Sequence, residues 1–246
     1  MNAVRLVFHG LVPAVLLLFG MAAQAGGQAP SGMADRVLPC TACPGKEGRA
    51  TPSGYFPRIA GKPVGYLYNQ LRNFREGRRS YPQMAYLLTN LTDGYLYEMA
   101  AWFSDLQLPY APPAASTATK QMLREGEALA RHGDAAREIP ACAQCHGEQL
   151  TGAEPFIPSL LGLSADYLGS QLGAWRTGQR HAQAPDCMAD IARRLTLSQV
   201  QAVAGWLAAQ PVPGDGRARA ETPAHPPLAC GSLEAQPAPG QAMEAQ

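Results

Sequence analysis

The stretch Pro140-Ala-Cys-Ala-Gln-Cys-His-Gly-Glu148 decides the fold of this 246-residue chain. Within it, Cys142, Cys145 and His146 spell C-x-x-C-H, the attachment signature of c-type haem. Positions i and i+3 share one face of a helix, so both thiols can reach the same edge of a porphyrin. The imidazole of His146 can then bind the iron from the proximal side. The motif therefore predicts a covalently attached haem c.

Other uses of C-x-x-C fit the rest of the chain less well. A zinc site needs a second ligand pair at short spacing, and the later Cys187 and Cys230 do not form one. A thioredoxin-like dithiol belongs to a βαβ pattern, and no such pattern is visible. Haem is therefore the chemistry that these residues favour.

The first 25 residues have the order of a secretory signal peptide. Arg5 is followed by an apolar run from Leu11 to Phe19, and Ala23-Gln-Ala25 forms an A-x-A cleavage site. The run is too short to span a bilayer, which disfavours the alternative of a retained N-terminal anchor. We expect residues 1–25 to be removed on export and the mature protein to be soluble and periplasmic.

A segment of the chain is repeated after 101 residues, since Tyr66-Leu67 returns as Tyr167-Leu168. Further matched pairs keep the same offset: Pro57 with Pro158, Gly61 with Gly162, Gln70-Leu71 with Gln171-Leu172, Phe74-Arg75 with Trp175-Arg176, Gly77 with Gly178, and Arg79 with Arg180. So many pairs in register predict two copies of one domain, each near the lower end of the usual domain size.

The repeat sets the expected domain boundaries. The first domain is expected over residues 26–108 and the second over 117–210. The prolines of residues 109–116 favour an extended linker between them. Residues 211–246, rich in Pro, Ala and Gly, are expected to form a mostly irregular tail.

Apolar residues recur with helical period in both copies, and no stretch alternates as a strand does. The faces predicted to be buried are Met122, Gly126, Leu129 and Ala130; Tyr167, Leu168, Gln171, Leu172 and Trp175; Leu197, Val200, Val203, Ala204 and Leu207; and Leu96, Met99, Ala100 and Phe103. Thr196 with Gln199 reads as a capping box, and His132-Gly133 as a helix stop. Gly126 inside a helix indicates close approach of another helix, because glycine there lowers stability relative to alanine.

The chain resembles tandem two-domain class I cytochromes c of the c-four type over residues 30–210. The resemblance is carried by Cys142-Ala-Gln-Cys-His146, Tyr167-Leu-x-x-Gln-Leu172, Gly178-x-Arg180, and Met188 followed by Leu195. It implies an all-α fold of a few short helices packed round a haem in each domain. It also implies that Met188, on the loop before the last helix, is the sixth iron ligand opposite His146.

The first copy departs from the motif, because Cys40-Thr-Ala-Cys43 is followed by Pro44. Proline has no lone pair for iron, and no histidine lies in the mature first domain: the five are His9, His132, His146, His181 and His225. Three interpretations remain open. The domain is a haem-free relic with a Cys40–Cys43 disulfide, it holds haem through another ligand such as Lys46 or water, or it is a local variant of an ordinary two-haem protein. Met84, the counterpart of Met188, is an iron ligand only under the last two.

Cys187 and Cys230 have two possible uses. In an oxidising compartment a leftover pair is most simply a disulfide. Alternatively, Cys187 binds iron as a thiolate in place of Met188, as in related two-haem thiosulfate dehydrogenases. His181 is expected to be an exposed polar residue rather than a ligand.

The expected function is electron transfer rather than catalysis. No Ser-His-Asp or paired-carboxylate constellation appears, and a net charge of +1 argues against nucleic acid and for at most peripheral membrane association. We expect an exported cytochrome that passes single electrons between a dehydrogenase and a terminal oxidase or small carrier. The alternatives are a thiosulfate-dehydrogenase-like oxidoreductase with a Cys-ligated haem, and a haem-free first domain that docks a partner.

Overall fold

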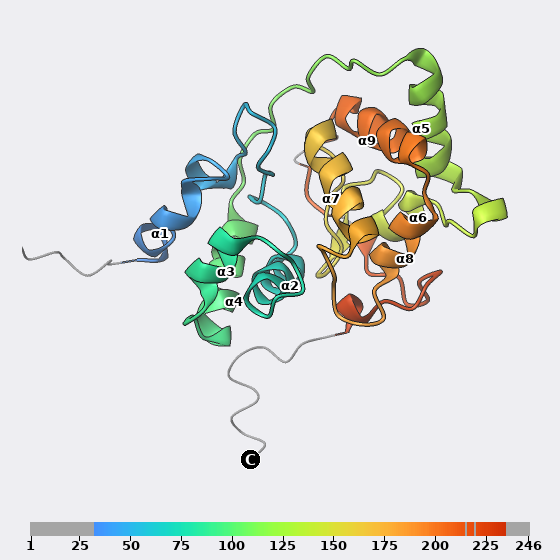
Figure 1. Ribbon diagram of the computed structural model, residues 1–246. Coiled ribbons are helices and arrows are strands. Elements are labelled where there is room, and N and C mark those ends of the chain that lie inside the picture. Colours follow the sequence, from blue (N-terminus) through green and yellow to red (C-terminus); the bar gives the residue numbers. More distant parts are fainter. Residues whose placement is uncertain (1–31, 215, 219, 235–246) are drawn as a thin grey trace, which may run out of the picture. The chain divides into compact units, whose positions relative to one another are not determined.

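A computed structural model describes residues 32–214, 216–218 and 220–234 (Figure 1). The predicted signal peptide, residues 1–25, lies outside the described residues. Over these residues the fold is all-α apart from one pair of two-residue strands, which confirms the predicted class. The described part of the chain contains no helix long and apolar enough to cross a membrane.

The helices fall into two groups that follow the repeat. The first group comprises α1 (Met33–Arg36), η1 (Leu38–Thr41), η2 (Lys46–Gly48), α2 (Val64–Arg75), α3 (Pro82–Leu88) and α4 (Asp93–Asp105). The second comprises α5 (Lys120–His132), η3 (Ala135–Arg137), α6 (Cys142–His146), α7 (Ala165–Thr177), α8 (Cys187–Arg194) and α9 (Leu197–Ala209). We call residues 32–108 the first half and residues 117–210 the second half.

The core of the first half lies between α2 and α4. The predicted face of α4 is buried in full, with Leu96, Met99, Ala100 and Phe103 all at most 5% exposed. The side chain of Thr92 begins this helix, because its hydroxyl accepts a hydrogen bond from the amide of Tyr95. This half therefore has an apolar core of its own.

The core of the second half is formed by α5, α7 and α9. The capping box at the start of α9 is present, with the Gln199 amide donating to Thr196 Oγ1 and the Thr196 amide donating to Gln199 Oε1. The predicted buried face of α9 is correct except at Leu197, which is 69% exposed. Leu197 lies more than one turn before Ala202, where α5 packs on α9, so it lies outside the contact.

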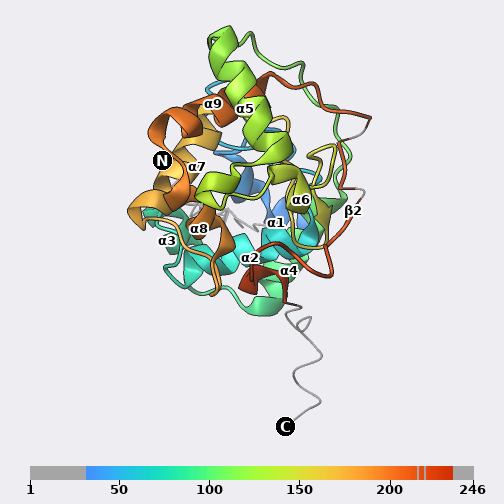
Figure 2. The ribbon, with the colours of Figure 1, turned by 90° about the vertical axis from the view of Figure 1, so that its right-hand side faces the viewer.

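The helices α5 and α9 approach most closely at Gly126, and they lie side by side in both views (Figure 1 and Figure 2). A Cβ atom on Gly126 would come within 2.2 Å of the Ala202 carbonyl oxygen and 2.7 Å of the Trp206 Cβ. The predicted close approach of another helix is therefore confirmed. Gly133 ends α5 with a φ of 72°, a conformation that glycine adopts without strain.

Replacing Gly126 by Ala is expected to destabilise the protein. In an exposed helix this change stabilises by about 1 kcal/mol, but here the added methyl group meets backbone, which cannot rotate away. We expect a net loss of about 1–3 kcal/mol in the free energy of unfolding, as for overpacked cores. Gly169→Ala is the matched control, because nothing lies within 4 Å of a Cβ there. Equal unfolding midpoints for the two variants in urea would contradict the prediction.

The two halves contact each other through their repeated arginines. Arg79 and Arg180 form an isolated antiparallel bridge. The Arg79 guanidinium donates to Gln171 Oε1 at 2.7 Å as well as to Gln70 Oε1 at 3.0 Å. The Arg180 guanidinium donates to the same two oxygen atoms, to Gln171 Oε1 at 2.8 Å and to Gln70 Oε1 at 3.0 Å. Each arginine thus binds the glutamines of both halves.

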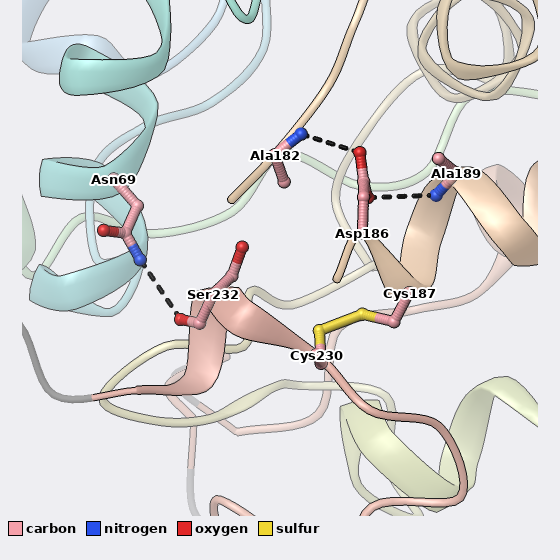
Figure 3. The surroundings of a disulfide bond; sticks show 7 residues. All are labelled: Asn69, Ala182, Asp186, Cys187, Ala189, Cys230 and Ser232. Carbon is pink, nitrogen blue, oxygen red and sulfur yellow. Dashed lines mark hydrogen bonds between the residues drawn. A yellow bond between two sulfur atoms is a disulfide. The ribbon is translucent and has the colours of Figure 1, made fainter. Parts of the chain in front are cut away.

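The described residues after 210 contain one short strand and one short helix and are attached to the rest of the chain at several points. Strand β2 (Ala220–Glu221) pairs in parallel with β1 (Ala153–Glu154), a pairing that the sequence does not predict because each strand has only two residues. The Asn69 side chain in α2 donates to the backbone oxygen of Ser232, in the short helix η4 (Gly231–Leu233) (Figure 3). The tail therefore contacts both halves.

Candidate haem site

The C-x-x-C-H motif forms the short helix α6. Its start is fixed by Gln144, whose side-chain oxygen accepts a hydrogen bond from the Ala141 amide at 2.8 Å. Cys142 and Cys145 lie one turn apart, and neither thiol is in a disulfide. His146 ends the helix. The structure thus brings the three motif residues together on one turn, with both thiols free to form thioether bonds.

The His146 imidazole is buried and held in one orientation. Its Nδ1 lies 2.7 Å from the carbonyl oxygen of Pro158. A carbonyl only accepts, so Nδ1 carries the proton and the lone pair lies on Nε2. Metal-binding histidines commonly donate their other ring N–H to a backbone carbonyl in this way. The sequence repeat singles out Pro158, but its carbonyl's role becomes visible only in the structure.

The electrostatic surroundings keep this imidazole neutral. The pKa of His146 is lowered to about 4, chiefly by burial; the Pro158 carbonyl acts in the opposite direction, and the nearby charge of Lys62 contributes a smaller lowering. Because only the neutral ring offers a lone pair, this environment favours iron binding over protonation at neutral pH. Lys62 comes from the first half, and no local sequence signal points to it.

The two thiols of α6 do not have the character of a redox dithiol. Burial raises the pKa of Cys142 to about 11, and burial also raises the pKa of Cys145. Redox-active cysteines have lowered pKa values, because the thiolate is the reactive form. The environment therefore disfavours the thioredoxin-like interpretation. Among the described residues there is also no cluster of three or more His, Cys, Asp or Glu side chains that could hold a bare metal ion.

Met188 and Cys187 lie in the first turn of α8, whereas the family resemblance implies a loop at Met188. Asp186 begins this helix: its carboxylate accepts from the Ala189 amide at 3.1 Å and from the Ala182 amide at 2.7 Å (Figure 3). That cap starts a separate helix of eight residues before α9, which the sequence does not predict. Met188 is half-buried.

Cys187 is joined to Cys230 by a disulfide, so the structure pairs the two leftover cysteines (Figure 3). The Gly231 amide donates to the carbonyl oxygen of Pro185 at 2.9 Å, which adds a second contact at the same point. The tail is therefore held against the segment that leads into Met188. His181, which was expected to be exposed, is half-buried, and its amide donates to the Arg78 carbonyl of the first half.

Polar groups near α7 fit the two carboxylates that a haem carries. The indole Nε1 of Trp175 is buried without a hydrogen-bond partner. Arg180 stacks on the Trp175 ring, 3.7 Å from its centroid, and forms no ion pair with a described residue. Burial and the charge of Arg79 lower the pKa of Arg180 to about 10. An unpaired indole donor and a buried cation suit an anionic group, so the residues of the second half fit haem. The sequence repeat contains both side chains but does not show their surroundings.

The first half keeps one backbone hydrogen bond of the motif but lacks its α-helix and its ligand, since Cys40 lies in η1 and residues 42–44 form a turn. The Ala50 amide donates to the Pro44 carbonyl at 2.7 Å, as the Gly152 amide donates to the His146 carbonyl at 2.9 Å. Cys40 and Cys43 are both free, so the disulfide expected under the relic interpretation is not formed in the structure. This backbone hydrogen bond is thus present in both halves although Pro44 replaces His146.

Met84 lies in α3 and packs, half-buried, against the apolar core of the first half. This position is that of a side chain that fills the apolar core. Lys46, the alternative ligand considered above, has an exposed side chain in η2.

Comparisons with known proteins agree with this site. The cytochrome c family profile matches residues 123–210, which contain α6 and the helices around it. The chain is 33% identical to cytochrome c4 of Pseudomonas aeruginosa, over 80% of this chain and 96% of that protein. The structure of reduced cytochrome c4 from Pseudomonas stutzeri matches 72% of this chain and 96% of that chain, with a TM-score of 0.62 and 27% identity.

A helical fold built round C-x-x-C-H defines the chain as a c-type cytochrome. The comparisons identify the family within this class: the chain belongs to the cytochrome c4 family of electron-transfer haem proteins. A further relative is named "Thiosulfate dehydrogenase electron acceptor", from Thiomonas intermedia (strain K12). It is 40% identical over 173 residues, which are 70% of this chain and 79% of that protein.

Proposed function

We propose that this cytochrome accepts single electrons from an exported thiosulfate-oxidising dehydrogenase and passes them to a terminal oxidase or small carrier. The observation that carries the electron-transfer role is the His146 imidazole, held by Pro158 with Nε2 free beside two unpaired thiols. The choice of donor is supported by the 40% identical relative named as an electron acceptor of thiosulfate dehydrogenase.

The residues of the second half have distinct roles in this proposal. Cys142 and Cys145 would attach the haem, His146 would bind its iron, and Met188 would supply the second protein ligand. Haem c supplies an iron that takes up and releases one electron. The protein holds both ligands in place, excludes water from the imidazole, and donates the Nδ1 proton to Pro158 so that the ring cannot rotate. No substrate pocket is required.

A carrier is favoured over a thiosulfate-oxidising enzyme by the state of Cys187. A cysteine-ligated haem would need a free thiolate, whereas the Cys187 sulfur is bonded to Cys230. Met188 then remains as the neighbouring sulfur ligand, and a thioether raises the haem potential for electron transfer. We therefore infer that the protein is a carrier, not itself an oxidoreductase.

The proposed location is the periplasm. The predicted signal peptide supports export, and a structural disulfide is typical of an oxidising compartment. We also propose that only the second domain, residues 117–210, carries haem. The first domain, residues 26–108, then carries no haem and acts by contacting the second domain.

The proposal is tested with purified protein and a thiosulfate dehydrogenase in a stopped-flow spectrometer. We expect reduction of the haem on addition of thiosulfate only when the dehydrogenase is present. Met188→Ala is expected to remove the far-red methionine–iron charge-transfer band of the oxidised protein and to lower the potential enough to abolish reduction. Met84→Ala is the matched control and should leave the band unchanged. Reduction by thiosulfate without the dehydrogenase would identify an enzyme instead, and a band that survives Met188→Ala would reject Met188 as ligand.

A further inference from the structure

Lys62 is a buried cation at the contact between the two halves. Its residue is only 3% exposed, whereas the other two lysines of the chain, Lys46 and Lys120, have exposed side chains. The Lys62 ammonium donates to the backbone oxygen of Ser159 in the second half, at 2.9 Å. It forms no ion pair with a carboxylate among the described residues. Burying an ammonium that is not neutralised by a carboxylate is unfavourable. The presence of Lys62 at this position therefore suggests that it has a function.

The hydrogen bond of Lys62 ends one residue from the acceptor of the axial imidazole. Ser159 directly follows Pro158, whose carbonyl accepts the His146 Nδ1 proton at 2.7 Å. The charge of Lys62 already acts on this ring, since it disfavours a positive charge on His146. In a buried site this effect is screened far less than at the surface.

We propose that Lys62, supplied by the first half, raises the reduction potential of the haem that His146 holds in the second half. This inference rests on the proposed function, namely that His146 binds the iron. The oxidised iron carries one more positive charge than the reduced iron. A fixed cation nearby disfavours the oxidised state for the same Coulombic reason that it disfavours a protonated imidazole. The first half thereby acts on the redox centre without a haem of its own.

Two other charged or titratable groups near Lys62 are Arg58 and His146. Arg58 is buried, and its guanidinium donates to the backbone oxygens of Ala60, Leu108 and Pro109, so its position is fixed. Burial, with a smaller contribution from the charge of Arg58, lowers the pKa of Lys62 to about 7. Potentials are therefore best compared at pH 5.5, where Lys62 is protonated.

The experiment is a redox titration of the full-length, haem-loaded protein. Lys62→Met removes the charge and the donor, while Lys62→Gln removes the charge and keeps a donor. Lys120→Met, at the exposed start of α5, is the matched control for loss of a lysine. We expect both Lys62 variants to lower the potential, with a fall of roughly threefold to tenfold in the equilibrium constant for reduction, where tenfold corresponds to 59 mV. Lys120→Met should leave the potential unchanged.

The absorption spectrum and haem content of each variant separate this inference from the proposed function. Variants with the wild-type spectrum and a lowered potential support it. An unchanged potential in both Lys62 variants overturns it, and so does a potential lowered by Lys62→Met but kept by Lys62→Gln, because the hydrogen bond would then be sufficient. A wild-type protein without covalent haem would overturn the proposed function, and this inference with it.

Discussion

Replacing Pro44 by His is expected to raise the haem content from one to two per chain. The first half already holds two parts of an attachment turn. Cys40 and Cys43 are free thiols at the correct spacing, and the Ala50 amide binds the Pro44 carbonyl as the Gly152 amide binds that of His146. The missing part is a lone pair for iron, which an imidazole supplies and a pyrrolidine ring does not.

The variant Pro44→Ala is the control for the loss of the proline ring. It frees the backbone but adds no ligand, so its haem content should stay at one. Haem per chain is measured by the haemochrome absorbance of the denatured protein against its peptide absorbance. Two haems in the wild-type protein would show that the proline is tolerated, and the proximal ligand of the first half would then have to be another group. One haem in Pro44→His would show that the first half differs from the second in more than its ligand.

Cys230→Ser is expected to lower the free energy of unfolding by about 4 kcal/mol in the chain-entropy description of a disulfide that joins residues 43 apart. The unfolded chain gains the freedom of that loop. In the folded state, the tail loses its covalent bond to the helix that carries Met188. A Cβ on Gly231 would come within 2.2 Å of the Ala184 carbonyl oxygen, so the tail is closely packed on this segment and the bond adds to an existing contact.

Urea unfolding of three proteins measures the effect: the wild type, Cys230→Ser, and the double variant Cys187→Ser, Cys230→Ser. The two variants should be equally destabilised, because both lack the same bond. A reductant should bring the wild type to their level and leave them unchanged. A wild-type protein whose free energy of unfolding does not change with the reductant would contradict the disulfide. Cys187 would then again be a candidate iron ligand.

Much of the fold is predictable because it is encoded over short distances along the chain. The period of Leu96, Met99 and Phe103 and the Thr196–Gln199 capping box each involve residues a few positions apart. Gly126 is also informative by itself, since glycine inside an otherwise regular helix indicates a close neighbour. The exposure of Leu197 is missed because periodicity does not show where the partner helix ends.

The features that the sequence does not predict join residues far apart. The repeat identifies Arg79 and Arg180 as counterparts, but it does not show that each binds the glutamine of the other half. Lys62 and Ser159 are 97 residues apart, and no local pattern links them. Strand β2 consists of two residues whose pairing depends on the path of the tail. Such contacts depend on tertiary packing rather than on local propensity.

The position of the haem tests the central claim most directly. Protein purified from the periplasm of a host that attaches haem is digested, and its haem-bearing peptides are identified by mass spectrometry. The account predicts haem on the peptide that contains Cys142 and Cys145, and none on the peptide that contains Cys40 and Cys43. A Cys142–Cys145 peptide without haem would contradict it.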